Sequence, residues 1–319
     1  MNQVKVERFG PFPQVSRPVF MVSAALIVGF IVFGALFNEV AAALFSELQS
    51  MITHRFRWLF VILMNSALVF SLYLALSRFG DIRLGQQTEH PEYSLLSWFS
   101  MLFSAGIGIG LLYWGTAEPL YHFMAPPMGQ AQTVEAAKQA MNLSFLHWGL
   151  HAWALYCVVA LALAYFHYRR GLPLSIRSVL YPLLGQKIYG KWGHVVDILA
   201  VFGTMFGVVT SLGLGVMQIN AGFSSVLGIP NNITVQLGLI AFITLMATLS
   251  VMMGLDKGIK RLSDINILLT MLLLAFMIFL GPTQFIIDSF VENIGNYLTQ
   301  LVPLGFWSEA YSGTDWQAN

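Results

Sequence analysis

Charged residues and cysteines are scarce in this 319-residue chain, and their scarcity excludes several classes of protein. Asp, Glu, Lys and Arg make up 10% of the residues, against roughly 25% in a typical soluble domain. The single cysteine, Cys157, excludes an intramolecular disulfide and a cysteine-ligated metal site. Basic residues are scattered rather than clustered with aromatic residues, so nothing indicates nucleic-acid binding.

Long apolar runs are what the chain has instead. Hydrophobic residues account for 57% of the sequence and the mean hydropathy is +0.70. Runs of about 20 apolar residues recur along the whole length, as in polytopic helical membrane proteins. The runs predict an all-α, multi-pass protein in a lipid bilayer, with seven spans at residues 18–38, 57–77, 95–124, 142–166, 195–227, 233–253 and 264–281.

The distribution of basic residues predicts the orientation of these spans. With the N-terminus in the cytoplasm, 13 of the 16 basic residues lie inside and three (Arg55, Arg57 and Lys138) lie outside. Residues 1–17 are then cytoplasmic. The first apolar run is too long for a cleaved signal peptide.

After the last span, residues 282–301 alternate apolar and acidic residues at helical spacing, which predicts an amphipathic helix lying in the membrane interface. Residues 308–319 are polar, and residues 302–319 would begin an external loop. Because no closing element follows, we expect the sequence to be the N-terminal portion of a longer protein.

Three alternating glycines in the third span, Gly106, Gly108 and Gly110, weaken its helix by roughly 0.8–1 kcal/mol each. In a bilayer, irregular backbone survives only where it is buried in protein or lines a cavity. The glycines therefore predict a broken helix that binds a ligand. Close helix packing through small residues is the alternative. The nearby Glu118 is either functional or a structural carboxylate.

The fourth span carries aromatic residues suited to a cation. On one continuous helix, Trp148, Trp153 and Tyr156 cover about 140° of arc. Their rings could form one wall of a cage for a trimethylammonium group. A belt of aromatic residues at the lipid headgroups is the alternative.

Two histidines in the same span, His147 and His151, have a spacing compatible with a metal site in a membrane enzyme. The remaining histidines are isolated, and no catalytic triad or paired carboxylates occur, so neither an enzyme nor a transition-metal site is predicted. A channel would need a continuous polar pore, which the large apolar residues on most span faces oppose. In the fifth span, hydroxyls such as Thr204 and Ser211 either bind sodium or bond back to their own helix.

Several segments together resemble the betaine/choline/carnitine transporter (BCCT) family of secondary carriers. They are Phe-Ser-Ala-Gly-Ile-Gly-Ile-Gly and Tyr-Trp-Gly-Thr-Ala-Glu-Pro within 103–119, His-Trp-Gly-Leu-His-Ala-Trp-Ala-Leu-Tyr at 147–156, Thr-Ser-Leu-Gly-Leu-Gly at 210–215, and Gly-Leu-Asp-Lys-Gly-Ile-Lys-Arg-Leu-Ser at 254–263. The resemblance implies a LeuT-type fold of twelve spans, in which two extra helices precede two inverted five-helix repeats. Residues 18–94 would be the extra helices and 95–281 the first repeat.

The resemblance also implies site residues. It assigns the solute site to Gly106, Ile107, Gly108, Ile109, Gly110, Trp148, Trp153 and Tyr156. It assigns sodium to the backbone of Ser104 and Ile107 and to Thr204, with Ser211 near the place of a second threonine. That second threonine is Val208 in this chain, which puts a second sodium site in doubt.

Substrate choice follows from Gly110, because choline-selective relatives tend to have aspartate there. The resemblance thus predicts a symporter for betaine-like solutes in the bacterial inner membrane, with Na⁺ as coupling ion and no other cofactor. A proton-coupled or choline-preferring carrier is the alternative. Trimers are frequent in the family, so a homotrimer is a further expectation.

Overall fold

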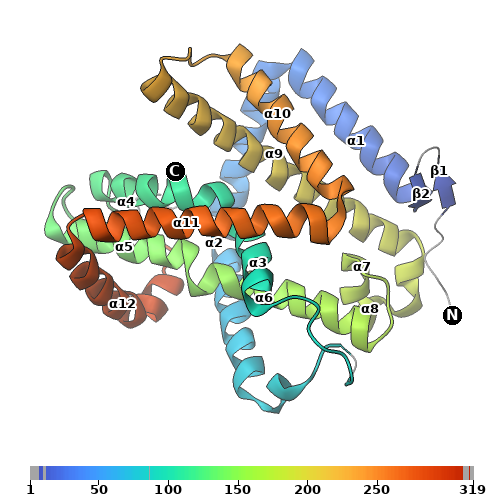
Figure 1. The fold of residues 1–319 in the computed structure, drawn as a ribbon. Coiled ribbons are helices and arrows are strands. Elements are labelled where there is room, and N and C mark those ends of the chain that lie inside the picture. The colour runs from blue at the N-terminus through green and yellow to red at the C-terminus, as the bar shows by residue number, and fades with distance from the viewer. Residues whose placement is uncertain (1–6, 10–11, 86, 312–315, 317–319) are drawn as a thin grey trace. The chain divides into compact units, whose positions relative to one another are not determined.

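The computed structural model describes residues 7–9, 12–85, 87–311 and 316 (Figure 1). The chain divides into two compact units. The first unit comprises Met1–Glu89, Leu146–Gly207 and Val302–Asn319, and the second comprises His90–Phe145 and Val208–Leu301.

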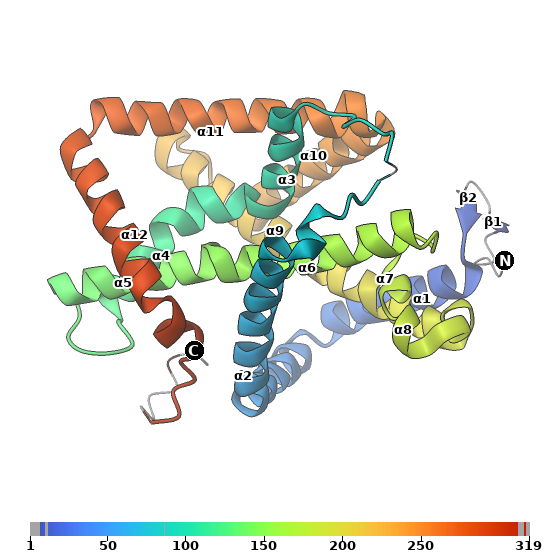
Figure 2. The ribbon, with the colours of Figure 1, turned by 90° about the horizontal axis from the view of Figure 1, so that it is seen from below.

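The first unit is helical apart from a β-hairpin near the N-terminus, which the sequence pattern did not predict. In chain order it holds β1 (Glu7–Phe9), β2 (Phe12–Val15), α1 (Arg17–Leu36), α2 (Asn38–Leu76), η1 (Arg78–Asp81), α6 (Leu150–Ala164), η3 (Tyr165–Arg169), α7 (Ile176–Val179), α8 (Tyr181–Leu184), η4 (Gly185–Tyr189) and the first part of α9 (Lys191–Leu227). The two strands pair antiparallel. Between α1 and α2, Phe37 has a non-helical backbone (φ −125°, ψ 46°), and the chain changes direction there (Figure 2).

The main helix packing of the first unit is between α2 and α6. Buried residues on the facing sides include Ala67 on α2 and Ala154 on α6, whose small side chains let two helices approach closely. The hydroxyl of Ser71 donates to the carbonyl of Ala154 at 3.4 Å.

A buried ion pair also stabilises the first unit. Arg177, which is fully buried, donates from Nε to Oδ2 of Asp197 at 2.7 Å and from Nη1 to the carbonyl of Ile188 at 3.2 Å. Its Nη2 lies 2.6 Å from the same Asp197 oxygen. A buried guanidinium without such a partner would be strongly destabilising.

The second unit consists of helices. It holds α3 (Leu95–Ile109), η2 (Gly110–Trp114), α4 (Gly115–Met124), most of α5 (Val134–Trp148), the second part of α9 (Lys191–Leu227), α10 (Ile233–Met252), η5 (Leu255–Ile259), α11 (Lys260–Leu280) and most of α12 (Thr283–Gly305). Its main packing is between α3 and α11, and α3 crosses α11 rather than running along it (Figures 1 and 2).

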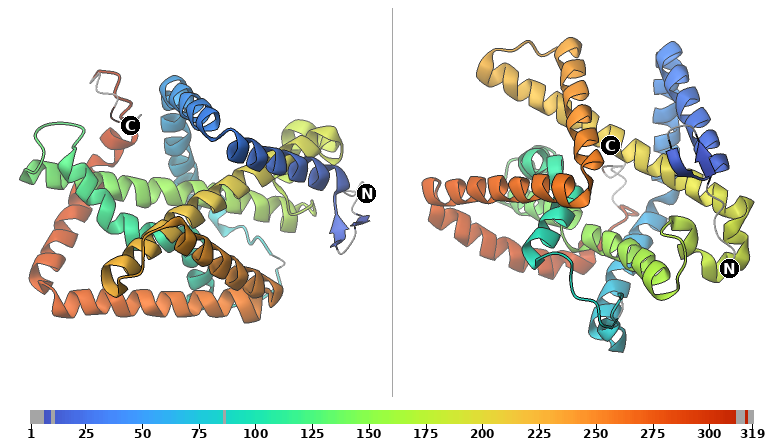
Figure 3. Two further views of the ribbon diagram at one scale, coloured as in Figure 1. Left: turned by 90° about the horizontal axis from the view of Figure 1, so that it is seen from above. Right: turned by 45° about the vertical axis from the view of Figure 1, so that its right-hand side comes forward.

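A short loop joins α9 to α10 in a helical hairpin (Figure 3). Gly228 follows α9 with φ +69°, a left-handed conformation that suits glycine at a helix C-terminus. The side chain of Asn232 then accepts from the N–H of Val235 at 3.0 Å and caps α10. The fully buried Asn220 donates to the carbonyl of Pro230 at 3.1 Å. These contacts explain why α9 ends and α10 begins where the sequence pattern predicted.

The segment before α3 contacts the motif that precedes α11. Desolvation, together with a hydrogen bond to Asp256 and the negative charges of Asp256 and Glu92, raises the pKa of Tyr93 above its ordinary value.

The motif before α11 also contains a close backbone approach. A Cβ at Gly258 would clash with the carbonyl oxygen of Ser250, so only glycine fits there.

The structure contains six helices that are long and apolar enough to span a membrane, within the residues that it describes. They are Arg17–Leu36, Asn38–Leu76, Val134–Arg169 (interrupted at Gly149), Lys191–Leu227, Ile233–Met252 and Leu255–Leu280. Six of the seven predicted spans are thus confirmed as apolar helices. The predicted third span, 95–124, is divided into α3, η2 and α4 instead. The predicted external segment containing Arg55 and Arg57 is helical and belongs to α2.

Candidate functional site

The helix of the third span becomes irregular later than the glycines at 106, 108 and 110 predicted. Regular α-helix continues through Gly106 and Gly108 to Ile109, and the irregular backbone is the π-helical segment η2, which begins at Gly110. Such π-helical turns are frequent at functional sites. The side chains of residues 105–109, including Ile107 and Ile109, lie outside the described part of the chain.

Ser104, whose backbone is a predicted sodium ligand, lies two residues before Gly106, and its side chain is hydrogen-bonded. Its hydroxyl accepts from Nδ2 of Asn266 on α11 at 3.1 Å. One face of α3 carries two further serines, Ser97 and Ser100, and these are buried. Ser97 donates to Oδ2 of Asp264 at 3.3 Å. We call Ser97, Ser100 and Ser104 the serine face of α3.

The aromatic residues of the fourth span do not lie on one continuous helix. α5 ends at Trp148 and α6 begins at Leu150, because Gly149 has a non-helical backbone (φ −97°, ψ −140°). The predicted arc of about 140° is therefore wrong for Trp148. Trp153 and Tyr156 do share α6, and their ring centroids are 5.8 Å apart with the planes inclined by 44°. The structure thus brings Trp153 and Tyr156 together.

The break at Gly149 also removes the basis for a metal site at His147 and His151, which lie on different helices. His147 is exposed, whereas His151 is 3% exposed. The Nε2 atom of His151 lies 3.0 Å from Oδ1 of Asn65 on α2. The shared-face geometry expected of two metal ligands is therefore not formed.

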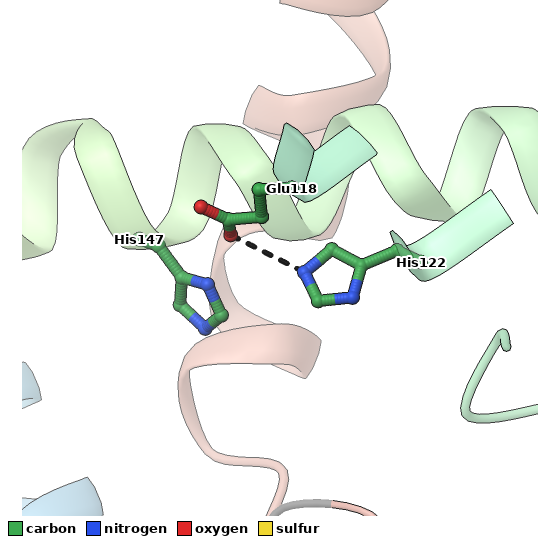
Figure 4. A group of neighbouring side chains, drawn as sticks. All are labelled: Glu118, His122 and His147. Carbon is green, nitrogen blue, oxygen red and sulfur yellow. Dashed lines mark hydrogen bonds and ion pairs between the residues drawn. The ribbon is translucent and has the colours of Figure 1, made fainter. Parts of the chain in front are cut away.

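Glu118 is buried in the first turn of α4, which continues directly from η2. Its Oε1 atom lies 3.2 Å from Nε2 of His122 one turn further along the same helix (Figure 4). This pairing is consistent with the structural alternative for Glu118, in which the carboxylate stabilises the helix beside Pro119.

On α9, the hydroxyl of Thr204 bonds back to its own helix, which is the alternative to sodium binding that the sequence left open. Thr204 is exposed and donates to the carbonyl of Ala200 at 2.9 Å, one turn back on its own helix. Ser211 and Val208 are also exposed. The role of Thr204 and Ser211 in binding sodium remains a prediction.

Two residues beside His151 of α6, Asn65 and Gly305, were missed by the sequence analysis. Asn65 donates from Nδ2 to the carbonyls of Val61 at 2.7 Å and Gly305 at 2.6 Å, and its Oδ1 atom contacts His151. We call Asn65, His151 and Gly305 the Asn65 network. A signal for Asn65 existed, since an amide inside an apolar run is a functional hypothesis by default.

Comparisons with known proteins identify the class and then the family. The six apolar helices and the polar residues buried between them define a multi-pass membrane protein. Residues 18–319 match the BCCT, betaine/carnitine/choline family transporter, and the chain belongs to this family. The family consists of transporters and not of enzymes.

Relatives in several bacteria are similar over nearly all of this chain. It is 43% identical over 305 residues to a glycine betaine transporter of Acinetobacter baylyi and 41% identical over 307 residues to a high-affinity choline transport protein of Escherichia coli, with 96% of the chain covered in both. It is 44% identical over 289 residues to a glycine betaine transporter of Bacillus subtilis, with 90% covered. The matched regions are 46%, 45% and 56% of these relatives, so the chain spans about half their length.

Proposed function

We propose that the protein to which this sequence belongs imports betaine-like quaternary ammonium solutes by sodium-coupled symport, with its N-terminus in the cytoplasm. The observation that carries this proposal is the ring pair of Trp153 and Tyr156 on α6. A trimethylammonium group has no N–H to donate, so aromatic faces attract it better than point acceptors do. Each ring contributes about 0.5–2 kcal/mol once water is removed.

The polar end of the solute distinguishes betaine from choline. An aspartate at the position of Gly110 could accept a hydrogen bond from the hydroxyl of choline and would repel the carboxylate of betaine. Glycine places no negative charge there, which supports betaine. Choline remains the second candidate because relatives of similar identity are named as choline transporters.

Sodium coupling rests on the start of the broken third span. In the proposed mechanism, sodium bound near Ser104 and Ile107 orders the segment that runs from α3 into η2, and the ordered segment then completes the solute site. Alternating access would follow from the preference of the ion and the solute for different conformations. Proton coupling is the competing proposal, because Val208 replaces a predicted sodium ligand.

The test is uptake of labelled glycine betaine by the whole protein in proteoliposomes, with and without an inward sodium gradient and with unlabelled choline as competitor. We expect saturable, sodium-driven uptake that choline inhibits weakly. Uptake that follows a proton gradient without sodium would overturn the coupling, and stronger transport of choline would overturn the substrate.

Within the same assay, Trp153→Ala should raise the KM for betaine about 2- to 30-fold, the range expected for one lost cation–π contact. Trp192→Ala is the matched control, because Trp192 is an exposed tryptophan on α9 outside the proposed solute site. An unchanged KM in Trp153→Ala would remove the aromatic pair from the site.

A further inference from the structure

The amide of Asn65 is held in one orientation by its neighbours. Both of its N–H groups point to carbonyl oxygens, those of Val61 and Gly305. Its oxygen must therefore face His151, 3.0 Å away. Because an amide oxygen only accepts, His151 must donate, and its proton is on Nε2. Every hydrogen-bonding group of the Asn65 side chain is then used.

The third member of the network is the end of a helix. Gly305 is the last residue of α12, and the final carbonyls of a helix have no partner within it. Asn65 supplies the missing donor at 2.6 Å. A Cβ on Gly305 would lie 2.6 Å from Oδ1 of Asn65 and 2.8 Å from Nε2 of His151, so the glycine lets the backbone approach both side chains.

The network lies on the opposite side of α6 from the aromatic pair. At about 100° per residue, Trp153 is about 200° and Tyr156 about 140° around the helix from His151. The two rings therefore bracket the direction opposite to His151. His151 and Ala154 are buried, whereas Tyr156 is 59% exposed. Fixing His151 against α2 sets the rotation of α6 and hence the direction in which both rings point.

We propose that Asn65 is a positioning residue for the solute site, which acts through His151 to hold Trp153 and Tyr156 in their binding orientation. The proposal rests on the proposed function of the aromatic pair and extends it to residues on α2 and at the end of α12. Asn65 and Gly305 have no contact with solute in this scheme.

The test compares variants of the whole protein in the betaine uptake assay, normalised to the amount of folded protein. Asn65→Ala and Gly305→Ala should each raise the KM about 2- to 30-fold, with a smaller change in the maximal rate, because the ring contacts weaken. Gly305→Ala is the sharper variant, since it removes no polar group. His151→Gln should keep a near-normal KM, because its amide N–H can occupy the place of Nε2. His151→Asn should raise the KM, since the shorter asparagine side chain cannot bring its amide N–H to the oxygen of Asn65.

Ser71→Ala is the matched control. Ser71 links the same two helices through Ala154 but does not touch the network, so its KM should not change. If Gly305→Ala and His151→Asn both keep a normal KM, or if only the amount of folded protein falls, the positioning role is wrong and the network is merely structural.

A second measurement separates this inference from the proposed function. The fluorescence of Trp153 is obtained as the difference between each protein and its Trp153→Phe counterpart in detergent. Asn65→Ala and Gly305→Ala should shift this difference spectrum, and Ser71→Ala should not. If the wild-type protein transports no betaine, the proposed function fails, and an unshifted spectrum would independently refute the positioning of Trp153.

Discussion

In the first unit, α2 and α6 share one buried amide with all its hydrogen bonds made, whereas in the second unit α3 and α11 share hydroxyl groups spaced along a helix. The two arrangements respond differently to the loss of a partner. A serine hydroxyl can bond back to its own helix, as Ser100 does to the carbonyl of Leu96 at 2.8 Å. Neither Asn65 nor His151 has an equivalent replacement for the hydrogen bond between them.

The comparison shows polar contacts concentrated on one amide between α2 and α6 and distributed over several side chains between α3 and α11. A concentrated network loses several bonds at once, so its substitutions should cost more. Substitutions in the serine face of α3 should cost less. The following stability changes test this ordering, all measured as thermal or denaturant unfolding of detergent-solubilised protein.

The largest effect should come from Asp197→Ala in the first unit. The substitution leaves the guanidinium of the fully buried Arg177 without its carboxylate. We expect a loss of about 3–5 kcal/mol. The double variant Arg177→Leu with Asp197→Leu should recover most of the loss, because it removes both charges. A small loss in the single variant would show that Arg177 does not depend on Asp197 for its stability in the buried site.

His151→Leu should rank second. It leaves the oxygen of Asn65 buried without a donor, which costs about 1–3 kcal/mol. Adding Asn65→Leu should cost less than the sum of the two single changes, since residues in contact are not additive. Additive losses would show that the two side chains do not act as a pair.

Ser97→Ala should have a smaller effect, about 0.6 kcal/mol and no more than about 1.7, as measured for hydrogen bonds between membrane helices. Asp264 keeps a second partner after this change, because Nζ of Lys260 lies 3.6 Å from its Oδ2 atom. A loss as large as that of His151→Leu would end the distinction between the two helix pairs.

Lys138→Ala should have the smallest effect. The ammonium of Lys138 lies 3.0 Å from the carboxylate of Glu292, but the two side chains are 46% and 59% exposed. Exposed ion pairs are screened by salt and often contribute nothing measurable. We expect an unchanged unfolding midpoint at physiological ionic strength. A clear loss of stability that disappears at about 1 M salt would show that the ion pair is stronger than its exposure suggests.

The apolar runs predicted the helices well where polar residues bound them on both sides. The span predicted at 233–253 forms α10 over Ile233–Met252, with Asn232 as its cap. The apolar runs did not predict that the helix of the second span already begins at Asn38, because residues 39–56 include polar side chains such as Glu39, Glu47 and Arg55. α2 continues as regular helix through these polar residues.

The candidate site was harder to predict because backbone geometry and distant contacts decide it. The glycines at 106 and 108 predicted a break, yet the helix continues to Ile109 and becomes irregular only at Gly110. Gly149 gave no comparable signal, and it is the residue that separates Trp148 from Trp153. For Asn65, the sequence shows a polar residue in an apolar run but not its partner 240 residues away.

That separation has a consequence for the order in which the protein is made. His151 emerges 86 residues after Asn65 and can pair with it early. Gly305 emerges 240 residues after Asn65, which at about 5–20 residues per second is a delay of about 12–48 s. Until then one N–H of a buried amide has no permanent acceptor. The end of α12 therefore completes the environment of α2 and α6 only after all six membrane-spanning helices of the described chain have been synthesised.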